Sequence, residues 1–212
     1  MIDNSFLPKS LKKATVNDIE KVVYIICKAF DNDPVFNWIV KQDNRRGARA
    51  EKLVTISFDL IIPFEEIYLS EKDNGAAVWV PPDNHKLSIN QTLKVLKMFI
   101  SVAGFGRLLE MMKFFNYMQS QHPKSPFFHL LYLGVLPEAQ GQGVGTSLLK
   151  PILKYCDEKG FTAYLENSNE KNLPFYQKNR FVTFNEWKIN NKGPRIWFME
   201  RKPQGKSICR IV

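Results

Sequence analysis

The feature that most constrains the fold of this chain is an apolar run, Phe127–Leu136, that leads directly into a turn with alternating glycines. The run has the length and composition of a buried strand, is interrupted by His129 and Gly134, and ends at Pro137. Beyond Gly143, apolar residues recur on one helical face, at positions 144, 148, 149, 152, 153 and 156. The sequence therefore predicts a strand, a glycine-rich turn and a helix in direct succession.

A glycine-rich turn at the start of a helix presents several backbone N–H groups to one point, and the helix dipole adds positive charge there. This is an anion site, and the spacing limits which anion it holds. A Walker phosphate loop needs Gly-Lys-Ser/Thr, but Gly145 is followed by Thr146 without a lysine. The glycines at 141, 143 and 145 are evenly spaced, which excludes the dinucleotide fingerprint. An ordinary glycine-rich turn without a ligand remains the alternative.

The remaining pattern, Gln140-x-x-Gly143-x-Gly145, resembles the pyrophosphate turn of the GNAT N-acetyltransferases, which hold acetyl-CoA. The segment 165–181 resembles the second CoA-side motif of that family, in which an Asn precedes a short helix that carries a Tyr. The strings at 122–126, 172–176 and 193–203 are similar to the puromycin-acetylating members. The likeness is dense from about Pro123 to Pro203 and thin over the first half of the chain.

The resemblance implies acetyl-CoA as co-substrate, with its pyrophosphate on the backbone N–H groups of the turn. The edge of the strand at 133–135 would pair with the pantetheine arm, and a backbone N–H near Val135 would stabilise the oxyanion. The residues assigned to acetyl-CoA are Leu133, Gly134, Val135, Gln140, Gly141, Gln142, Gly143, Val144, Gly145, Thr146, Asn172 and Phe175.

Two residues are the catalytic candidates. Tyr176 is assigned as general acid for the departing thiolate, and core packing of a Phe-Tyr pair is its alternative. Glu166 is assigned as a base that takes the amine proton through water, and a carboxylate bonded to the local backbone is its alternative. The histidines at 85, 122 and 129 are interpreted as structural, and no metal site is predicted. Where the family usually has a Gly, this chain has Arg180, so the left-handed helix cap is expected at Asn179 or not at all.

The order of elements predicts a mixed α/β fold: a mostly antiparallel central sheet flanked by helices. A hairpin over 66–80, with Asn74-Gly75 at its turn, and a closing hairpin over 181–201 supply antiparallel pairs, and a βαβ-like unit surrounds Gly143. A break in the sheet is expected around Gly134. A longer helix is predicted over 43–64, a kink at Pro151 in the helix after the glycine turn, and Pro174 in the first turn of a short helix. The resemblance implies that this is the GNAT acyl-CoA N-acyltransferase fold, as a single domain over 1–212 with a helical insert at about 84–122. The insert has two amphipathic stripes, which fit two helices packed on the core, helices that line an acceptor pocket, or a membrane-surface segment.

The composition limits the cellular location and the classes of partner that this chain is expected to have. No apolar run reaches the roughly 18 residues of a membrane span, and the first 12 residues lack a secretory h-region. Three widely spaced cysteines, at 27, 156 and 209, suggest neither disulfides nor a zinc site, so a cytoplasmic location is expected. The net charge of +9 is interpreted as Lys-rich solvated faces, ahead of a CoA-phosphate surface or an affinity for nucleic acid or membranes.

The sequence-based hypothesis is therefore an enzyme that transfers acetyl from acetyl-CoA directly to a primary amine, without nucleic-acid or membrane partners, as a monomer or homodimer. No cysteine lies in the motifs to carry the acetyl group covalently. A small amine, including an aminoacyl-type antibiotic such as puromycin, ranks above a protein N-terminus or lysine as acceptor. A non-catalytic module that binds acyl-CoA is the alternative from another class.

Overall fold

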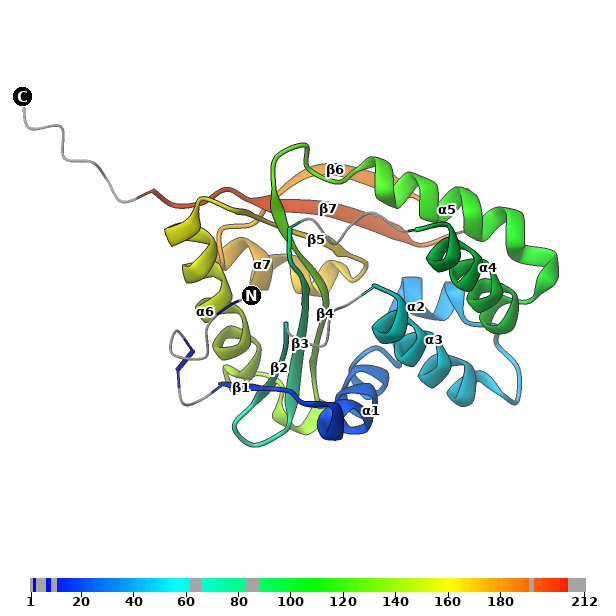
Figure 1. Cartoon of the computed structure of the whole chain (residues 1–212), viewed down its shortest axis with the longest axis horizontal. Coiled ribbons are helices and arrows are strands. Elements are labelled where there is room, and N and C mark those ends of the chain that lie inside the picture. The colour runs from blue at the N-terminus through cyan, green and yellow to red at the C-terminus, as the bar shows by residue number, and fades with distance from the viewer. Residues whose placement is uncertain are drawn as a thin grey trace, which may run out of the picture.

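One twisted sheet organises the molecule, and helices cover both of its faces (Figure 1). The structure, a computed structural model, describes residues 2, 7–8, 11–61, 66–82, 88–190 and 193–205. Within these residues the sheet has 7 strands in the order β1-β2-β3-β4-β5-β7-β6. The strands are β1 (Leu11–Lys13), β2 (Ile67–Ser70), β3 (Gly75–Val80), β4 (Phe127–Val135), β5 (Thr162–Asn167), β6 (Val182–Lys188) and β7 (Arg195–Arg201). The α-helices are α1 (Ile19–Ala29), α2 (Pro34–Ile39), α3 (Arg46–Ile61), α4 (Ile89–Ala103), α5 (Leu108–Ser120), α6 (Val144–Lys159) and α7 (Leu173–Lys178).

The strand pairing confirms the predicted mixed sheet. All neighbouring strands pair antiparallel except β4 and β5, which are parallel and joined through α6. The β2–β3 and β6–β7 hairpins lie where the sequence predicted them. In the first of these turns the left-handed residue is Asp73, with φ 53°, whereas the Asn-Gly pair was expected to supply the turn chemistry.

The two faces of β3 define two cores. Ala76, Val78 and Val80 pack with α1, α3 and α4 on one face, and Ala77 and Trp79 pack with α6 on the other. Every residue of β3 is buried, as expected for a central strand covered on both sides.

The parallel pair β4–β5 opens along its length. Phe127 pairs with Thr162 and His129 with Tyr164, and the β4–β5 ladder ends there. The break was predicted around Gly134, but the pairing ends earlier, at His129. Gly134 instead pairs with Ala76 of β3. Because Gly134 has no side chain, α1 packs closely against β4 there: an added Cβ would lie 2.9 Å from Cδ1 of Ile26. The two strands therefore diverge over the carboxyl half of β4 and leave an opening in the sheet.

The segment 88–121 forms two helices, α4 and α5, which separate at Gly104 with φ 91°. The buried side of α4 contributes Val95, Phe99 and Val102 to the core that α1 and α3 share. From α5, Phe114 stacks near Trp187 of β6 at 6.1 Å between ring centroids. The interpretation as two helices on the core is thus confirmed, while 84–87 of the expected insert lie outside the described residues.

Several smaller expectations were also resolved. The helix predicted over 43–64 is α3, with 62–65 outside the described residues, as are His85 and Cys209. In the part of the chain that the structure describes, no helix is long and apolar enough to cross a membrane. Pro151 lies inside α6, which runs without interruption from Val144 to Lys159, and the kink expected there stays a prediction.

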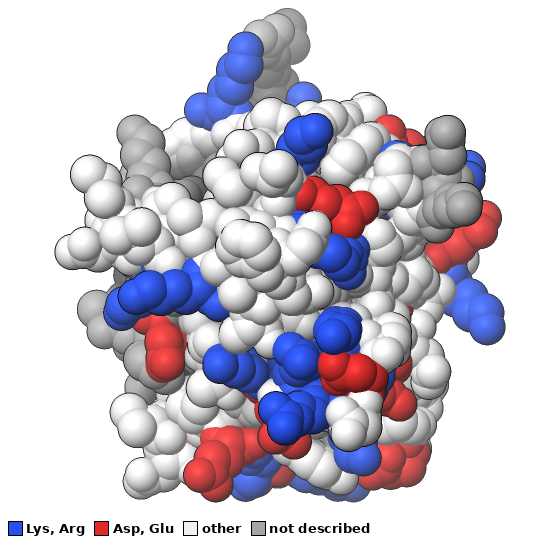
Figure 2. All heavy atoms as spheres, turned by 90° about the vertical axis from the view of Figure 1, so that its right-hand side faces the viewer, with Lys and Arg blue, Asp and Glu red and all other residues white. Residues whose placement is uncertain are grey.

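Charged side chains are mixed on the face formed by α2 to α5. Figure 2 shows Lys and Arg side chains next to Asp and Glu side chains on this side of the molecule. Ion pairs explain part of the pattern: Arg46 to Asp31 at 2.7 Å, and Arg49 to Asp43 at 3.2 Å. Part of the basic charge on these elements is therefore neutralised locally.

Candidate active site

A cavity of about 680 Å³ lies where β4 and β5 diverge. It brings together the two predicted catalytic residues, Tyr176 and Glu166, and every residue assigned to acetyl-CoA except Gly134 and Gln142. The lining residues that the sequence analysis assigned no role include Lys28 in the last turn of α1 and Asn32 and Asp33 in the segment after it. Segments far apart in the sequence thus meet at one opening in the sheet.

The glycine turn forms one wall of the cavity. Gly141 and Gly143 have φ values of 75° and 83°, and a Cβ added to either would meet nothing within 4 Å. They are therefore required by their left-handed backbone and not by close packing. Gly143 is the N-cap of α6, so the first N–H groups of that helix have no partner within it and, with the helix dipole behind them, can bind an anion.

The glutamine side chains of the turn donate hydrogen bonds to nearby backbone carbonyls. Gln140 donates its side-chain N–H to the carbonyl of Val135 at 3.1 Å, which ties the turn to the end of β4. Gln142 donates to the carbonyl of Glu138 at 2.8 Å and does not line the cavity. Gly145 is needed for packing, because an added Cβ would lie 3.3 Å from the ring of Phe175.

The free edge of β4 faces the cavity. Leu136 donates its N–H to the carbonyl of Asn74 on the β3 side. Because successive residues of a strand alternate in the direction of their backbone groups, the N–H groups of Val135 and Leu133 point to the opposite edge. That edge is where the β4–β5 ladder has ended, so it can pair with an extended amide-containing ligand.

The short helix α7 positions Tyr176. Its first turn contains Pro174, as predicted, and Asn172 precedes it. The predicted move of the left-handed cap to Asn179 is wrong: Asn179 has φ −90°, and Arg180 itself takes φ 66°. The N–H of Phe181 donates to the carbonyl of Tyr176 at 3.1 Å and that of Arg180 to Gln177 at 2.8 Å, so the cap keeps the Schellman geometry that a glycine would have made.

The Tyr176 side chain is buried between the rings of Phe175, at 5.2 Å, and Phe181, at 5.9 Å. Burial raises the pKa of Tyr176 above its ordinary value, and the nearby charge of Asp33 adds to the shift. The hydroxyl therefore stays protonated and is a hydrogen-bond donor at neutral pH. A raised pKa also makes complete proton transfer to a thiolate less favourable, so hydrogen bonding to the departing sulfur is the more effective contribution.

Asp33 is a cavity residue that the sequence analysis did not assign to the site. It is the N-cap of α2 and accepts the N–H of Phe36 at 2.8 Å, while the hydroxyl of Ser168 donates to its other oxygen. Burial raises the pKa of Asp33, although these hydrogen bonds oppose the shift. The Asp-Pro sequence was a signal for the cap, but nothing local to it indicated the cavity.

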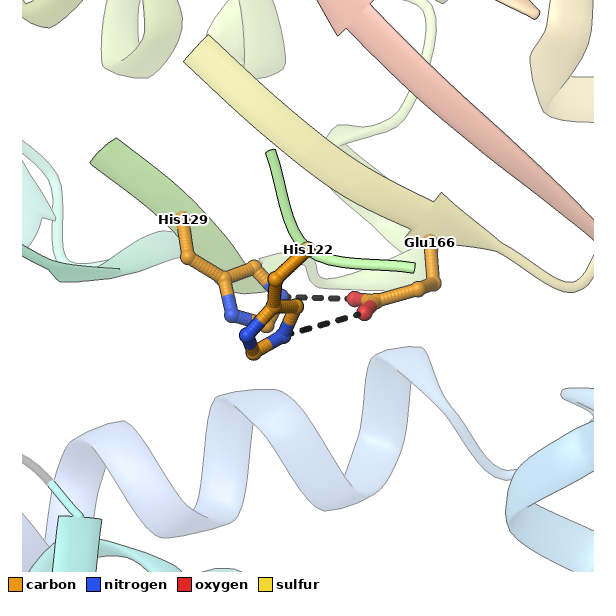
Figure 3. A group of neighbouring side chains, drawn as sticks. All are labelled: His122, His129 and Glu166. Atoms are coloured by element: carbon orange, nitrogen blue, oxygen red, sulfur yellow. Dashed lines mark hydrogen bonds and ion pairs between the residues drawn. The ribbon is translucent and has the colours of Figure 1, made fainter. Parts of the chain in front are cut away.

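Glu166 is the centre of a cluster that includes two histidines (Figure 3). Its Oε2 lies 2.6 Å from Nε2 of His129 on β4, and its Oε1 lies 3.9 Å from Nε2 of His122 in the loop before that strand. The hydroxyl of Tyr164 donates to Oε1 at 2.9 Å. The alternative of a carboxylate bonded to the local backbone is therefore not what the structure has.

The charge of Glu166 is stabilised by these neighbours. Burial by itself would raise the pKa of Glu166, but His129, His122 and the Tyr164 hydroxyl outweigh it and hold the pKa below its usual range. Glu166 is thus an ionised carboxylate on the cavity wall at neutral pH. The sequence signal for the cluster was weak: only the two-residue spacing of Tyr164 and Glu166 on one strand predicts a shared face.

Comparison with known proteins shows which family and fold this chain is similar to. The model of the acetyltransferase (GNAT) family matches residues 64–181. An uncharacterized N-acetyltransferase of Schizosaccharomyces pombe is 27% identical over 211 residues, which cover 92% of this chain and 84% of that protein.

Two solved structures are similar over almost their whole length. One is described as a histone acetyltransferase HPA2 and related acetyltransferase from Corynebacterium glutamicum, with a TM-score of 0.68, 21% identity, and coverage of 94% of this chain and 98% of that one. The other is a Drosophila melanogaster polyamine N-acetyltransferase, with a TM-score of 0.63, 12% identity, and coverage of 91% and 98%. At these identities the two structures show a shared fold.

Proposed function

The chain belongs to the acetyltransferase (GNAT) family of acetyl-CoA-dependent acyltransferases, and we propose that it transfers acetyl directly to a primary amine of a small molecule. The observation that carries this proposal is the convergence on one cavity of the glycine turn, the free edge of β4, Tyr176 and Glu166. Each part supplies something that acetyl transfer needs: an anion site, a place for an extended amide arm, a donor and a base.

The residues of the glycine turn would hold the pyrophosphate of acetyl-CoA through the backbone N–H groups of 141–146. The edge of β4 would pair with the pantetheine amides, and the N–H of Val135 would stabilise the oxyanion of the tetrahedral intermediate. Asn172 and Phe175 line the same cavity, beside the arm in this arrangement.

Tyr176 would donate a hydrogen bond to the departing sulfur. An unperturbed Tyr has a pKa of about 10 and a thiol about 8.5, so full proton transfer is uphill by about 2 kcal/mol even before burial is counted. Hydrogen bonding as the charge develops avoids most of this cost. Glu166 would accept the proton of the attacking amine, directly or through one water.

The class of acceptor is inferred from two lines of support. The local strings at 122–126, 172–176 and 193–203 are similar to puromycin-acetylating enzymes, whose α-amino acceptor costs only about 1.1 kcal/mol to neutralise at pH 7, against about 4.6 kcal/mol for an alkyl amine. The solved Drosophila relative forms N-acetylagmatine, the product of an amine acceptor. Because α4 and α5 do not line the cavity, they give no argument against a protein N-terminus or lysine.

The test is mass spectrometry of an amine panel incubated with acetyl-CoA and either wild type or Tyr176→Phe. The panel contains puromycin, phenylalaninamide, phenethylamine, agmatine and a peptide with a free N-terminus. We expect one small amine to gain an acetyl group, and the variant to slow that reaction by roughly 10²–10⁴ while acetyl-CoA still raises its Tm.

Other outcomes would redirect the proposal. If only the peptide reacts, the acceptor class is wrong and the chemistry stands. If no acceptor reacts although acetyl-CoA raises the Tm, the chain is a binding module. If Tyr176→Phe matches wild type in rate, Tyr176 packs in the core and another group serves the thiolate.

A further inference from the structure

The cluster of His122, His129 and Glu166 extends from the cavity wall toward the surface. Glu166 lines the cavity, His129 is buried behind it, and His122 lies in the loop whose next residues, Lys124 to Pro126, are exposed. Figure 3 shows both imidazole rings directed at the Glu166 carboxylate. An inference about this cluster rests on the proposed function, because it concerns the proton that the acceptor amine gives up.

Glu166 alone is a poor final acceptor for that proton. An ordinary carboxylate has a pKa of about 4.3, an imidazole about 6.5 and an alkyl ammonium about 10.4. A proton that reaches an imidazole is therefore held roughly a hundredfold more strongly than one left on a carboxylate of ordinary pKa. The hydrogen bonds around Glu166 stabilise its charged form and weaken it further as a base.

We propose that His122 is the final proton acceptor of the acyl transfer, and that Glu166 passes the proton to it. One N–H bond of the bound ammonium breaks as an O–H bond forms on Glu166. That O–H bond then breaks as an N–H bond forms at Nε2 of His122, which leaves an imidazolium beside the restored carboxylate. His122 finally releases a proton to solvent from its loop. The separation of 3.9 Å is closed by a small rotation of the ring or by one bridging water.

His129 and Tyr164 are positioning residues in this scheme. An ionised carboxylate only accepts hydrogen bonds, so the 2.6 Å contact is a donation from Nε2–H of His129 to Oε2. The Tyr164 hydroxyl donates to Oε1. Among the described residues, the titratable groups in contact with the Glu166 carboxylate include His129, His122 and Tyr164, and these contacts fix the carboxylate between the cavity and the loop.

The same three residue types could in principle hold zinc, since their ligand atoms all lie within 4.8 Å of one another. Ligands of a tetrahedral zinc ion at 2.0–2.1 Å are separated from each other by about 3.3 Å. The 2.6 Å between His129 and Glu166 is a hydrogen-bond distance and leaves no room for an ion between those two atoms. The geometry therefore favours proton transfer over metal binding.

The experiment compares wild type with His122→Gln on two acceptors of matched shape, phenethylamine and phenylalaninamide, from pH 6.5 to 9.5. At pH 7 we expect the variant to lose ten- to hundredfold in kcat/KM for phenethylamine. The loss should shrink as pH rises, because more of the amine is already neutral. For phenylalaninamide, whose α-amino pKa is nearer 7.8, the loss should be below about twofold at pH 9. If only one of the two is a substrate, its pH profile alone carries the test.

The control is Gln121→Ala, the neighbouring residue, which bonds Asn185 at 2.7 Å and lies outside the cluster. It should leave every rate unchanged, and acetyl-CoA should raise the Tm of all variants alike; His122→Asn is the second variant if His122→Gln folds poorly. A loss that is equal for both amines and at every pH would mean a structural role and would overturn the proposal, as would no loss at all.

Zinc gives a separate overturning result: activity removed by EDTA and restored by Zn²⁺ in wild type but not in His122→Gln. Failure of the proposed function is distinguishable from these outcomes, because wild type would then acetylate no amine at all.

Discussion

Arg180 holds a backbone conformation that suits glycine. Its φ of 66° ends α7 and directs the chain into β6, so the position of Tyr176 depends on it. A left-handed conformation costs a residue with a Cβ about 1–2 kcal/mol. The Arg180 side chain recovers little of this, because its hydrogen bond to Gln204, 2.8 Å long, is exposed.

We therefore expect Arg180→Gly to raise the free energy of unfolding by about 0.5–1 kcal/mol, the relief of strain being partly offset by the greater freedom of glycine in the unfolded chain. Urea denaturation measures this. Arg180→Ala is the control, because it removes the side chain but keeps the strained backbone, and it should not exceed wild type in stability. If Arg180→Ala stabilises as much as Arg180→Gly, the side chain and not the backbone is the source of the strain.

Some residues of the candidate site could be predicted from the sequence and others could not. The glycine turn could be predicted because local spacing determines it, and Tyr176 was assigned because the segment 165–181 resembles a family motif. The partners of Glu166 could not, because His122 and His129 come close only through the loop before β4 and the parallel register of β4 with β5. A histidine alone carries no spacing signal, so only the tertiary structure distinguishes a buried packing residue from a member of a cluster.

At the scale of elements, the predictions succeeded where the pattern was local. The hairpins and the strand–turn–helix unit each have their signal within one continuous segment, 66–80, 181–201 and 127–156. The predicted end of the β4–β5 pairing was wrong because the divergence of two strands depends on the helices that pack on each face of the sheet. The residues of the strands themselves give little indication of it. The break in the sheet was predicted at Gly134 because a glycine weakens a strand. In the structure, the missing side chain of Gly134 instead allows α1 to pack closely against β4.

Because α1 packs closely against β4 at Gly134, a larger side chain at this position should destabilise the fold. In Gly134→Ala the new Cβ would lie 2.9 Å from Cδ1 of Ile26 and 3.1 Å from Cβ of Ala29, so we expect a loss of about 1–3 kcal/mol in the free energy of unfolding. Ile26→Val removes that Cδ1 and alone should cost about 0.5–1.5 kcal/mol.

Because both changes act on one contact, the double variant should lose less than the sum of the two. Urea denaturation of the four proteins gives the coupling. Strict additivity would show that the close approach of β4 and α1 is relieved elsewhere.

At the scale of the whole molecule, the glycine turn, the free edge of β4 and the N-terminus of α6 meet at the carboxyl end of β4, where we propose that the pyrophosphate binds. We expect acetyl-CoA to stabilise the whole fold, by about 2.7 kcal/mol when its concentration is 100 times Kd. In Gly143→Ala the φ of 83° becomes strained although the new Cβ meets nothing within 4 Å, so the variant should lose stability and most of the ligand-induced rise in Tm. Gly160→Ala is the matched control, because Gly160 is also left-handed, with φ 77° and ψ 21°, has equally open space, and lies at the opposite end of α6. It should lose stability similarly but keep the full rise in Tm. If both variants keep it, the turn does not hold the pyrophosphate, because a backbone distortion there should disturb the N–H groups that would bind it.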